Sequence, residues 1–524
     1  MKLKTREEQL SNLQENIIWD IVIIGGGATG LGCAVDSASR GFKTLLLEQY
    51  DFAKGTSSRS TKLVHGGVRY LAQGDVSLVR EALKERGLLF QNAPHLVNKQ
   101  SFVIPCFGLF SKIKYLVGLK LYDWLSGKYS FGSSIYLNKN KVLDRLKGIS
   151  EKHVSGGIEY YDGQFDDARL AINLAQTAID HGATVLNYAK VTSLSKGNNS
   201  KLNGLTFIDA ENQKEYNIQT KSIINATGVF VDDILNMDTP GRNHLVRPSQ
   251  GVHLVLDRSF MKGDSALMIP ETSDGRVLFA VPWHEHLVVG TTDTPLDSHS
   301  LEPVALQKEI NFILETAGAY LEKRPTESDV LSVFAGLRPL AAPDKSTNKT
   351  KEISRSHKLI VSPSGLVTIT GGKWTTYRKM AEDTINETIK VCGLEEKSCA
   401  TEQLKIHGYK AQKEGSYLDI YGSDALSIKN IIIQQPEFGN KLIDSFPYTA
   451  AEVIWFVRNE MARSIEDVLA RRLRLLFLDA KAAVEIAPKV AQLMASEMGY
   501  GKEWETQQVN NFNAIASNYI LKKK

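Results

Sequence analysis

The sequence predicts an α/β fold: a Rossmann-like dinucleotide-binding domain, an antiparallel-sheet domain and a small C-terminal helical domain. Three observations predict it. A glycine-rich turn joins an apolar strand to a helix near the N-terminus, a strand-rich segment occupies residues 246–355, and helical periodicity dominates beyond residue 400. With 524 residues, the chain is long enough for two or three domains.

Composition and charge restrict the classes of function. The chain is 42% hydrophobic and 23% charged, which is typical of a globular protein. Its net charge of +4 is too small to indicate nucleic-acid binding. The cysteines show neither a CxxC pair nor a ligand-like histidine spacing, so we expect reduced thiols and no metal site; they are Cys33, Cys106, Cys392 and Cys399.

The N-terminus and the hydropathy pattern predict a cytoplasmic protein. The first sixteen residues, MKLKTREEQLSNLQEN, are charged and polar and have no apolar core, unlike a signal peptide. No run approaches the ~18 apolar residues that a membrane-spanning helix needs. Any contact with a membrane is therefore expected at its surface.

The turn GGGATG is the first nucleotide-binding signal. It follows the apolar run 21–24, which is typical of a buried parallel strand, and leads into a helix-like stretch over residues 31–39. Gly25 permits the tight turn and Gly27 lets the backbone approach a pyrophosphate, while Gly30 lets the helix pack closely on the strand. The helix N-terminus adds amide donors for the phosphates.

An acidic residue and two later segments extend this signal. A second apolar strand, residues 44–47, ends at Glu48, which is placed to accept a hydrogen bond from a ribose hydroxyl. Residues 222–228 form another strand that ends in small residues. Residues 365–378 are expected to form a strand, a Gly pair and the start of a helix. Such strand ends are where a second part of a long cofactor is expected to lie.

The stretch TSSRSTKLVHGGVRY, residues 56–70, carries many hydrogen-bonding groups but few that build a core. With the other motifs it resembles the FAD-dependent (respiratory, quinone-linked) glycerol-3-phosphate dehydrogenases of the D-amino-acid-oxidase-like flavoprotein family. The resemblance covers most of the chain and rests on GGGATG with Glu48, SSRSTKLVHGGVRYL, FDDARL, NATG, GTTDTP, GLRPL and GGKWTTYRKMAE.

The resemblance implies a function. It implies non-covalently bound FAD and the oxidation of sn-glycerol 3-phosphate to dihydroxyacetone phosphate, by hydride transfer to flavin N5. A membrane quinone would take the electrons. In the family, the hydroxyl-rich stretch wraps the pyrophosphate and then runs beside the flavin ring, which would account for its polar groups.

The resemblance also implies cofactor-binding residues. These are Gly25, Gly27, Gly30, Glu48, Thr56, Ser57, Ser58, Lys62, Leu63, Val191, Gly228, Gly372, Lys373, Trp374 and Thr375. Lys373 lies at a helix start, where the helix dipole repels a cation, so a functional reason is favoured over a plain helix-terminal lysine. Near the flavin N1–C2=O edge it would stabilise the anionic reduced ring.

Candidate catalytic and substrate-binding residues follow the same motifs. Arg338 and Arg355 are expected to bind the substrate phosphate, because a guanidinium matches its geometry; the alternative is a solvated surface charge. His65 and His253 are both candidates for the general base, and a structural role stays open for each. Arg69 and Tyr70 are expected to orient substrate, although Tyr70 would serve equally as an aromatic wall.

The order of the motifs predicts discontinuous domains. An amphipathic helix is expected over residues 170–179, ended by Gly182 and followed by a strand at 183–188, and a hairpin is expected around Asp274-Gly275. We assign the FAD-binding domain to 16–100, 161–245 and 359–395, the substrate-binding domain to 101–160 and 246–358, and the helical domain to 400–524.

Two segments are candidates for a membrane contact on the inner face of the cytoplasmic membrane. In residues 107–125, lysines 112, 114 and 120 accompany an apolar set, namely Leu109, Phe110, Ile113, Leu116, Val117, Tyr122 and Trp124. The alternative is a buried helix packed on the substrate domain. Arg471, Arg472 and Arg474 are a second candidate anchor, although a solvated helix face is favoured. The sequence leaves open whether the protein forms a homodimer.

Three other functions compete with this interpretation. A glycerol-3-phosphate oxidase would use oxygen and make hydrogen peroxide. An amino-acid or amine oxidase of the same fold would need one arginine for a carboxylate, against the two expected here. A flavin-stabilised scaffold without catalysis would leave Lys373, Arg338 and His65 idle.

Overall fold

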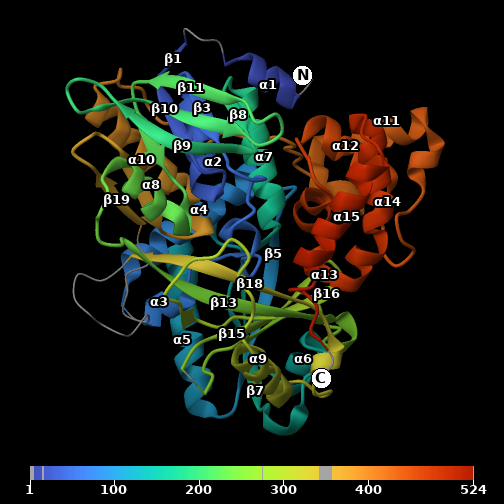
Figure 1. The fold of residues 1–524 in the computed structure, drawn as a ribbon. Helices are drawn as coiled ribbons and strands as arrows, with labels where there is room; N and C mark the ends of the chain where they lie inside the picture. Colours follow the sequence, from blue (N-terminus) through green and yellow to red (C-terminus); the bar gives the residue numbers. More distant parts are fainter. Residues whose placement is uncertain (1–4, 14–16, 73, 274, 342–356, 523–524) are drawn as a thin grey trace.

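The computed structural model describes residues 5–13, 17–72, 74–273, 275–341 and 357–522. Its strands form a six-stranded, a ten-stranded and a four-stranded sheet. Figure 1 shows the six-stranded and four-stranded sheets above the ten-stranded sheet, and the C-terminal helices as a separate red layer beside them. The predicted α/β class is confirmed.

The six-stranded sheet is parallel except for its β19 edge. Its order is β19 (His357–Val361), β20 (Val367–Gly371), β12 (Ile223–Asn225), β2 (Ile21–Ile24), β3 (Thr44–Leu47) and β8 (Thr184–Leu186). One face packs on helices α2 (Ala28–Ser39), α7 (Asp167–Asp180) and α10 (Tyr377–Cys392). The predicted strand–turn–helix unit and the helix ended by Gly182 are confirmed.

The other face of this sheet is covered by the four-stranded sheet. That sheet has the order β1 (Ile18–Trp19), β11 (Glu215–Thr220), β10 (Leu202–Asp209) and β9 (Ala189–Lys196). Helix α8 (Val231–Asp238) joins the same apolar cluster, and α1 (Arg6–Ser11) lies at the outer end. Because both faces of the central strands are buried, every residue of β2 and β3 except Thr44 is apolar.

The ten-stranded sheet is built from segments on both sides of the nucleotide-binding motifs. It contains β4 (Leu63–Val64), β5 (Val97–Cys106), β6 (Ile135–Asn138), β7 (Gly156–Phe165), β13 (Val246–Asp257), β14 (Ala266–Ile269), β15 (Leu278–Trp283), β16 (His286–Gly290), β17 (Thr294–Pro295) and β18 (Val330–Ala341). The pairing of β14 with β15 is antiparallel, as the predicted hairpin requires. β4 belongs to this sheet although it lies within the first predicted FAD-binding segment.

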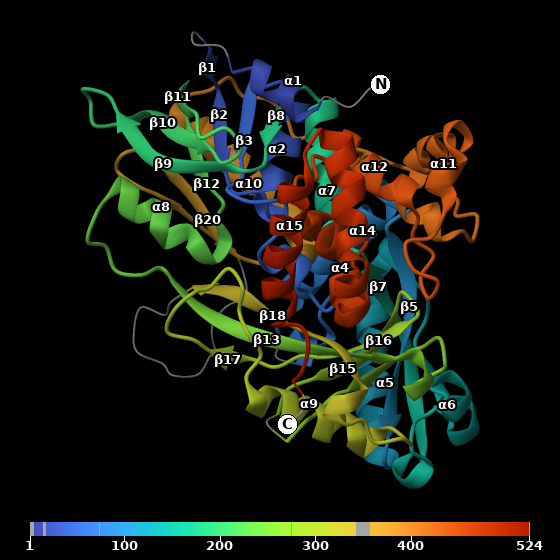
Figure 2. The same cartoon turned by 45° about the vertical axis from the view of Figure 1, so that its right-hand side comes forward.

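Helices cover both faces of the ten-stranded sheet. On one face α6 (Lys139–Arg145) and α9 (Gln307–Tyr320) join its core. The other face carries α5 (Leu109–Ser126), which packs beside α3 (Val68–Ala72) and α4 (Val76–Asn92). In both views α5 lies at the end of the molecule opposite α1 (Figures 1 and 2). Among the described residues, no helix combines the length and apolarity needed to cross a membrane.

Helix α5 has two different faces. Leu119 and Tyr122 are buried on its inner face, and Tyr122 is only 1% exposed. On its outer face Phe110 is 82% exposed and Trp124 72% exposed. The assignment of Tyr122 to an outward apolar face is therefore wrong. The inner face of α5 packs on the ten-stranded sheet, as the alternative of a helix packed on the substrate domain predicts, but the apolar residues of its outer face are exposed. We call the outward residues the α5 stripe: Leu109, Phe110, Ile113, Val117, Leu121 and Trp124.

The C-terminal part is helical, as predicted, and its helices range from 4 to 19 residues. It comprises α11 (Ala425–Gln434), α12 (Ala450–Asn459), α13 (Leu475–Leu478), α14 (Ala480–Met498) and α15 (Lys502–Ala516). The helix-period run 450–479 is not one helix, because a separate π-helical turn, Asp467–Arg472, lies between α12 and α13.

Arg471, Arg472 and Arg474 are buried, so the predictions of a basic anchor and of a solvated face are both wrong. Arg471 and Arg472 both pair with Asp51, which follows β3. Arg474 Nη2 lies 2.8 Å from Asp167 Oδ1, at the start of α7. These carboxylates of the nucleotide-binding part neutralise the arginines and hold the helical part against it.

Candidate active site

A cavity of about 710 Å³ lies between the six-stranded and ten-stranded sheets. On one side it reaches the carboxyl ends of the parallel strands, at Ile24 of β2 and Leu47 of β3. On the other side it reaches β13 and β18, at His253 and Arg338. Ligands of open parallel sheets bind at such strand ends, so this cavity is the candidate site.

The nucleotide end of the cavity is built by the GGGATG turn. Gly25 and Gly27 line it, whereas Gly30 lies behind, where an added Cβ would be 1.9 Å from the Gly25 carbonyl oxygen. The carboxylate of Glu48 accepts hydrogen bonds from the amides of Gly26 (2.6 Å) and Tyr50 (2.8 Å). Burial raises the pKa of Glu48, and these two donors oppose that shift.

Hydroxyls of the polar stretch bind other parts of the protein as well as facing the cavity. The side chain of Ser57 accepts a hydrogen bond from the Ala28 amide at 2.9 Å, at the start of α2. Thr56 Oγ1 donates to the Leu337 carbonyl at 2.5 Å, which joins the stretch to β18. Thr56 and Ser57 both line the cavity, so they hold its two walls together.

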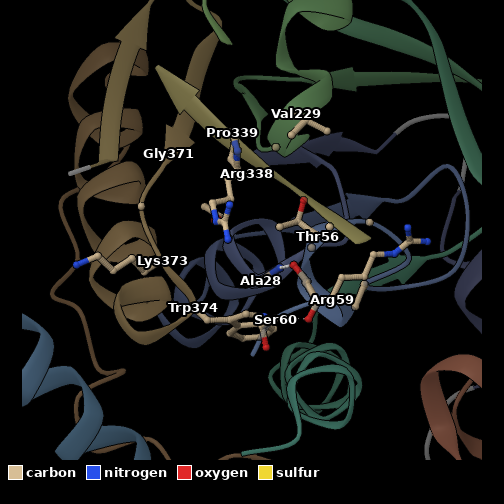
Figure 3. A pocket seen from close by; sticks show the side chains of 18 of the residues that line it. Ala28, Thr56, Arg59, Ser60, Val229, Arg338, Pro339, Gly371, Lys373 and Trp374 are labelled. Carbon is tan, nitrogen blue, oxygen red and sulfur yellow. Dashed lines mark hydrogen bonds between the residues drawn. The ribbon is translucent and has the colours of Figure 1, made fainter. Parts of the chain in front are cut away.

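Arg338 lies in the wall of the cavity on β18. Its Nη2 donates to the Thr292 carbonyl at 3.0 Å and to Thr291 Oγ1 at 3.2 Å. An added Cβ on Gly251 of β13 would lie 2.3 Å from Arg338 Nη2, so a side chain at this position would displace the guanidinium. Figure 3 shows Arg338 and Thr56 facing the same interior space.

Lys373 lies on the opposite wall, directly after the Gly pair. Its side chain points away from Arg338 in Figure 3, and its Nζ lies 3.9 Å from the centroid of the Tyr70 ring. Trp374, next in the chain, donates from Nε1 to the Ser57 carbonyl at 2.9 Å. The segment after β20 is thus bound to the polar stretch.

The two candidate bases differ in their surroundings. His253 is 2% exposed; its ring stacks on Phe334, and its Nε2 lies 2.9 Å from Thr61 Oγ1. Burial, and then the charges of Lys62 and Arg338, hold the pKa of His253 well below its usual value. His65 lines the cavity and is half-buried, and its amide donates to Thr375 Oγ1 at 3.1 Å.

Most of the predicted site residues line this cavity. They are Gly25, Gly27, Glu48, Thr56, Ser57, Leu63, His65, Tyr70, Val191, Gly228, His253, Arg338, Gly372, Lys373, Trp374 and Thr375. Arg355 and the side chain of Arg69 lie outside what the structure describes. The sixteen lining residues include strand residues of the ten-stranded and four-stranded sheets and loop residues that follow strands of the six-stranded sheet, and they come from segments hundreds of residues apart.

Two predicted cofactor contacts, Lys62 and Ser58, have side chains that do not line the cavity. Lys62 is fully buried, and its Nζ donates to Asp167 Oδ2 and to the Ser58 carbonyl, both at 2.7 Å. Burial is the main cause that lowers its pKa to about 7. Ser58 is also buried, and its hydroxyl donates to the Ala53 carbonyl at 2.5 Å. Both side chains stabilise the polar stretch through buried hydrogen bonds on the side that faces away from the cavity.

The structure adds cavity residues that the sequence reasoning missed. They are Arg59, Thr61, Asp162, Arg276, Thr291, Thr292 and Asp293, among others. The GTTDTP motif contains three of them, so its polar residues were a usable signal. Arg276 follows the predicted hairpin turn, and nothing in its local sequence distinguishes it from a surface residue.

Comparison with known proteins identifies the fold. The family described as FAD dependent oxidoreductase matches residues 20–378, and the C-terminal domain of alpha-glycerophosphate oxidase matches residues 367–505. The chain belongs to the FAD-dependent oxidoreductase family. Mitochondrial glycerol-3-phosphate dehydrogenase of Rattus norvegicus is 39% identical over an alignment of 534 positions, which covers 95% of this chain and 73% of the relative.

Solved flavoproteins share this architecture. The glycerol-3-phosphate dehydrogenase from Bacillus halodurans complexed with FAD has a TM-score of 0.81, 28% identity and full coverage of both chains. The L-alpha-glycerophosphate oxidase from Mycoplasma pneumoniae with FAD bound has a TM-score of 0.55 and 16% identity. It covers 74% of this chain and 98% of its own, and shows the fold alone.

The residues of the cavity fit FAD, the cofactor of this flavoprotein family. Gly25 and Gly27 leave the start of α2 open to a pyrophosphate. Glu48 lies at the end of β3, where its carboxylate would accept a hydrogen bond from a ribose hydroxyl. The Gly371–Gly372 pair lines the cavity beside Trp374 and leaves room for a planar ring. The cofactor would therefore extend from the β2–α2 turn towards Arg338.

Proposed function

We propose that this flavoprotein oxidises sn-glycerol 3-phosphate to dihydroxyacetone phosphate and passes the electrons to a membrane quinone. The observation that carries the proposal is a single cavity that holds both the dinucleotide-binding turn and Arg338, His65 and Lys373. The identity to glycerol-3-phosphate dehydrogenases supports the choice of substrate. Bound in this cavity, FAD supplies the hydride acceptor at N5.

Arg338 is the best-supported group for the substrate phosphate. Its guanidinium is oriented by Thr291 and Thr292, so little conformational freedom is lost when an anion binds. Arg276 is a further cation of the lining. A phosphate fixed in this way would hold the neighbouring secondary alcohol in one orientation. Tyr70 and Lys373 are proposed to close the opposite side.

We assign the general base to His65. A base must hold the proton that it removes, and His253 resists protonation because it is buried near Lys62 and Arg338. His253 Nε2 also forms a hydrogen bond with the Thr61 hydroxyl. In the proposed reaction, the alcohol proton passes to His65, and the hydrogen on C2 leaves with its electron pair.

A quinone acceptor requires access to the bilayer, which the α5 stripe would provide. Its exposed apolar side chains are accompanied by Lys114 and Lys120, which are exposed and suit anionic headgroups. We therefore propose a peripheral protein on the inner face of the cytoplasmic membrane. Exposed apolar side chains on a single helix favour this acceptor over oxygen, although an oxidase would share the substrate site.

Anaerobic reduction of the bound flavin tests the proposed substrate. Glycerol 3-phosphate is expected to remove the oxidised-flavin absorbance, whereas glycerol, other polyol phosphates and amino acids are expected to act much more slowly. Rapid reduction by an amino acid would instead assign the protein to the amino-acid oxidases. Reoxidation by air and by a quinone analogue, compared in the same cuvette, then separates an oxidase from a dehydrogenase.

A further inference from the structure

The buried face of α5 touches the segment that carries His65. Tyr122 is the contact: its hydroxyl accepts a hydrogen bond from the Gly66 amide at 2.9 Å and donates one to Asp162 Oδ2 at 2.6 Å. Gly66 directly follows His65, and Asp162 lines the cavity. The hydroxyl of Tyr122 therefore joins α5 to two parts of the candidate site.

The position of this hydroxyl is fixed from the other side of Asp162. Arg86 Nη1 donates to Asp162 Oδ1 at 2.8 Å, and both side chains are buried. Burial and the Asp162 charge raise the pKa of Tyr122 well above its usual value, so the phenol stays protonated as a donor. Arg86, Asp162 and Tyr122 thus form a rigid chain of hydrogen bonds that ends at Gly66.

The main chain around His65 is consequently held at two points. Thr375 Oγ1 accepts from the His65 amide at 3.1 Å, and Tyr122 accepts from the next amide. Gly66 and Tyr122 are closely packed, because an added Cβ on Gly66 would lie 2.5 Å from the Tyr122 hydroxyl oxygen. Two fixed amides define the direction in which the His65 side chain leaves the backbone.

We propose that Tyr122 is a positioning residue for His65. Its phenol orients the His65–Gly66 peptide so that the imidazole faces the substrate alcohol. This inference rests on the proposed function, in which His65 removes the alcohol proton. It gives the inner face of α5 a role in the flavin-reducing half of the reaction, separate from the outward stripe.

The test compares Tyr122→Phe with Tyr115→Phe by anaerobic stopped-flow reduction of the bound flavin by glycerol 3-phosphate. Tyr115 lies two turns earlier on α5, and its hydroxyl makes no hydrogen bond within the described part of the chain. We expect Tyr122→Phe to lower the limiting reduction rate by about ten- to a hundred-fold, with the apparent Kd for substrate changed by less than about threefold. Tyr115→Phe should reduce at the wild-type rate.

A double-mutant cycle with His65→Ala separates positioning from general damage. If Tyr122 acts through His65, adding Tyr122→Phe to His65→Ala should cause no further loss of rate. Flavin content and the urea midpoint show whether each variant is folded. Equal rates for Tyr122→Phe and wild type would overturn the inference, as would fully additive losses or an active His65→Ala enzyme. A wild-type flavin that glycerol 3-phosphate does not reduce would instead refute the proposed function.

Discussion

Arg338 and Asp293 form an ion pair in the wall of the cavity, with 3.3 Å between Nη1 and Oδ1. Asp293 also accepts a hydrogen bond from Ser249 of β13. The carboxylate thus holds one edge of the guanidinium, while Thr292 holds Nη2. An arginine fixed in this way is ready to bind an incoming phosphate, and that geometry underlies the first prediction.

Arg338→Ala should weaken the use of glycerol 3-phosphate far more than that of glycerol. A lost charge-assisted contact costs roughly 1.5–3 kcal/mol, or about ten- to a hundred-fold in kcat/KM. Glycerol lacks the phosphate, so its own slow turnover should change little. Steady-state kinetics with both alcohols measures the effect. An equal loss for both would mean that Arg338 supports the fold or the flavin.

Gly27→Val should yield largely apoprotein, because the new side chain would occupy the space that the pyrophosphate needs. A Cβ on Gly27 would already lie 3.1 Å from Ser57 Oγ. Gly501→Val is the matched control: both glycines are helix N-caps in extended conformation, and Gly501 has nothing within 4 Å of an added Cβ. The ratio of flavin absorbance to protein absorbance measures occupancy. Full occupancy in Gly27→Val would refute this cofactor site.

Replacing Lys112, Lys114 and Lys120 together with glutamate should release the protein from anionic vesicles and lower activity with a quinone. The lysines flank the α5 stripe, so their reversal turns attraction to anionic headgroups into repulsion. Activity with a soluble dye should persist, because the cavity is unchanged. Vesicle co-sedimentation and the two activities check this outcome. Undiminished binding would show that the anchor lies elsewhere.

The apolar part of the same surface can be tested separately. Phe110→Ser with Trp124→Ser should weaken binding to neutral vesicles by about tenfold or more, since two exposed aromatic anchors are lost. Leu426→Ser with Ile433→Ser is the control, because these α11 side chains are also exposed, at 65% and 74%. The same loss in both double variants would mean that exposed apolar area alone, and not α5, governs binding.

His407 should make stability depend on pH. Its Nδ1 lies 2.6 Å from Asp180 Oδ2 and its Nε2 lies 3.0 Å from Asp424 Oδ2. Burial alone would lower the pKa of His407, but these carboxylates raise it to about 9. Because the pKa is higher in the folded state, the stabilisation is complete below the unfolded pKa and is lost as pH rises through about 9.

His407→Gln should therefore lower the free energy of unfolding at about pH 6 by about 1–2 kcal/mol and have little effect at about pH 10. Urea unfolding of both proteins at the two pH values measures the difference, and subtraction removes other titrating groups. A difference that does not change with pH would show that the imidazole contributes by packing alone.

Local patterns in the sequence were enough to predict the nucleotide-binding unit. The turn at Gly25, the acid at Glu48 and the helix before Gly182 depend on the spacing of neighbouring residues, and all three lie as predicted. Backbone requirements of this kind are local, because a tight turn or a close helix–strand contact constrains the residues that form it.

The sequence determined the fold class, the family and sixteen of the residues that line the cavity. Only the tertiary structure decided that Lys62 is buried, that Tyr122 faces Gly66, and that Arg471 reaches Asp51, which is 420 residues away in the chain. Periodicity places a residue on one face of an element but does not identify what packs there. Whether a charge or a hydroxyl meets solvent, cofactor or a buried partner depends on distant segments, and these become neighbours only when the chain folds.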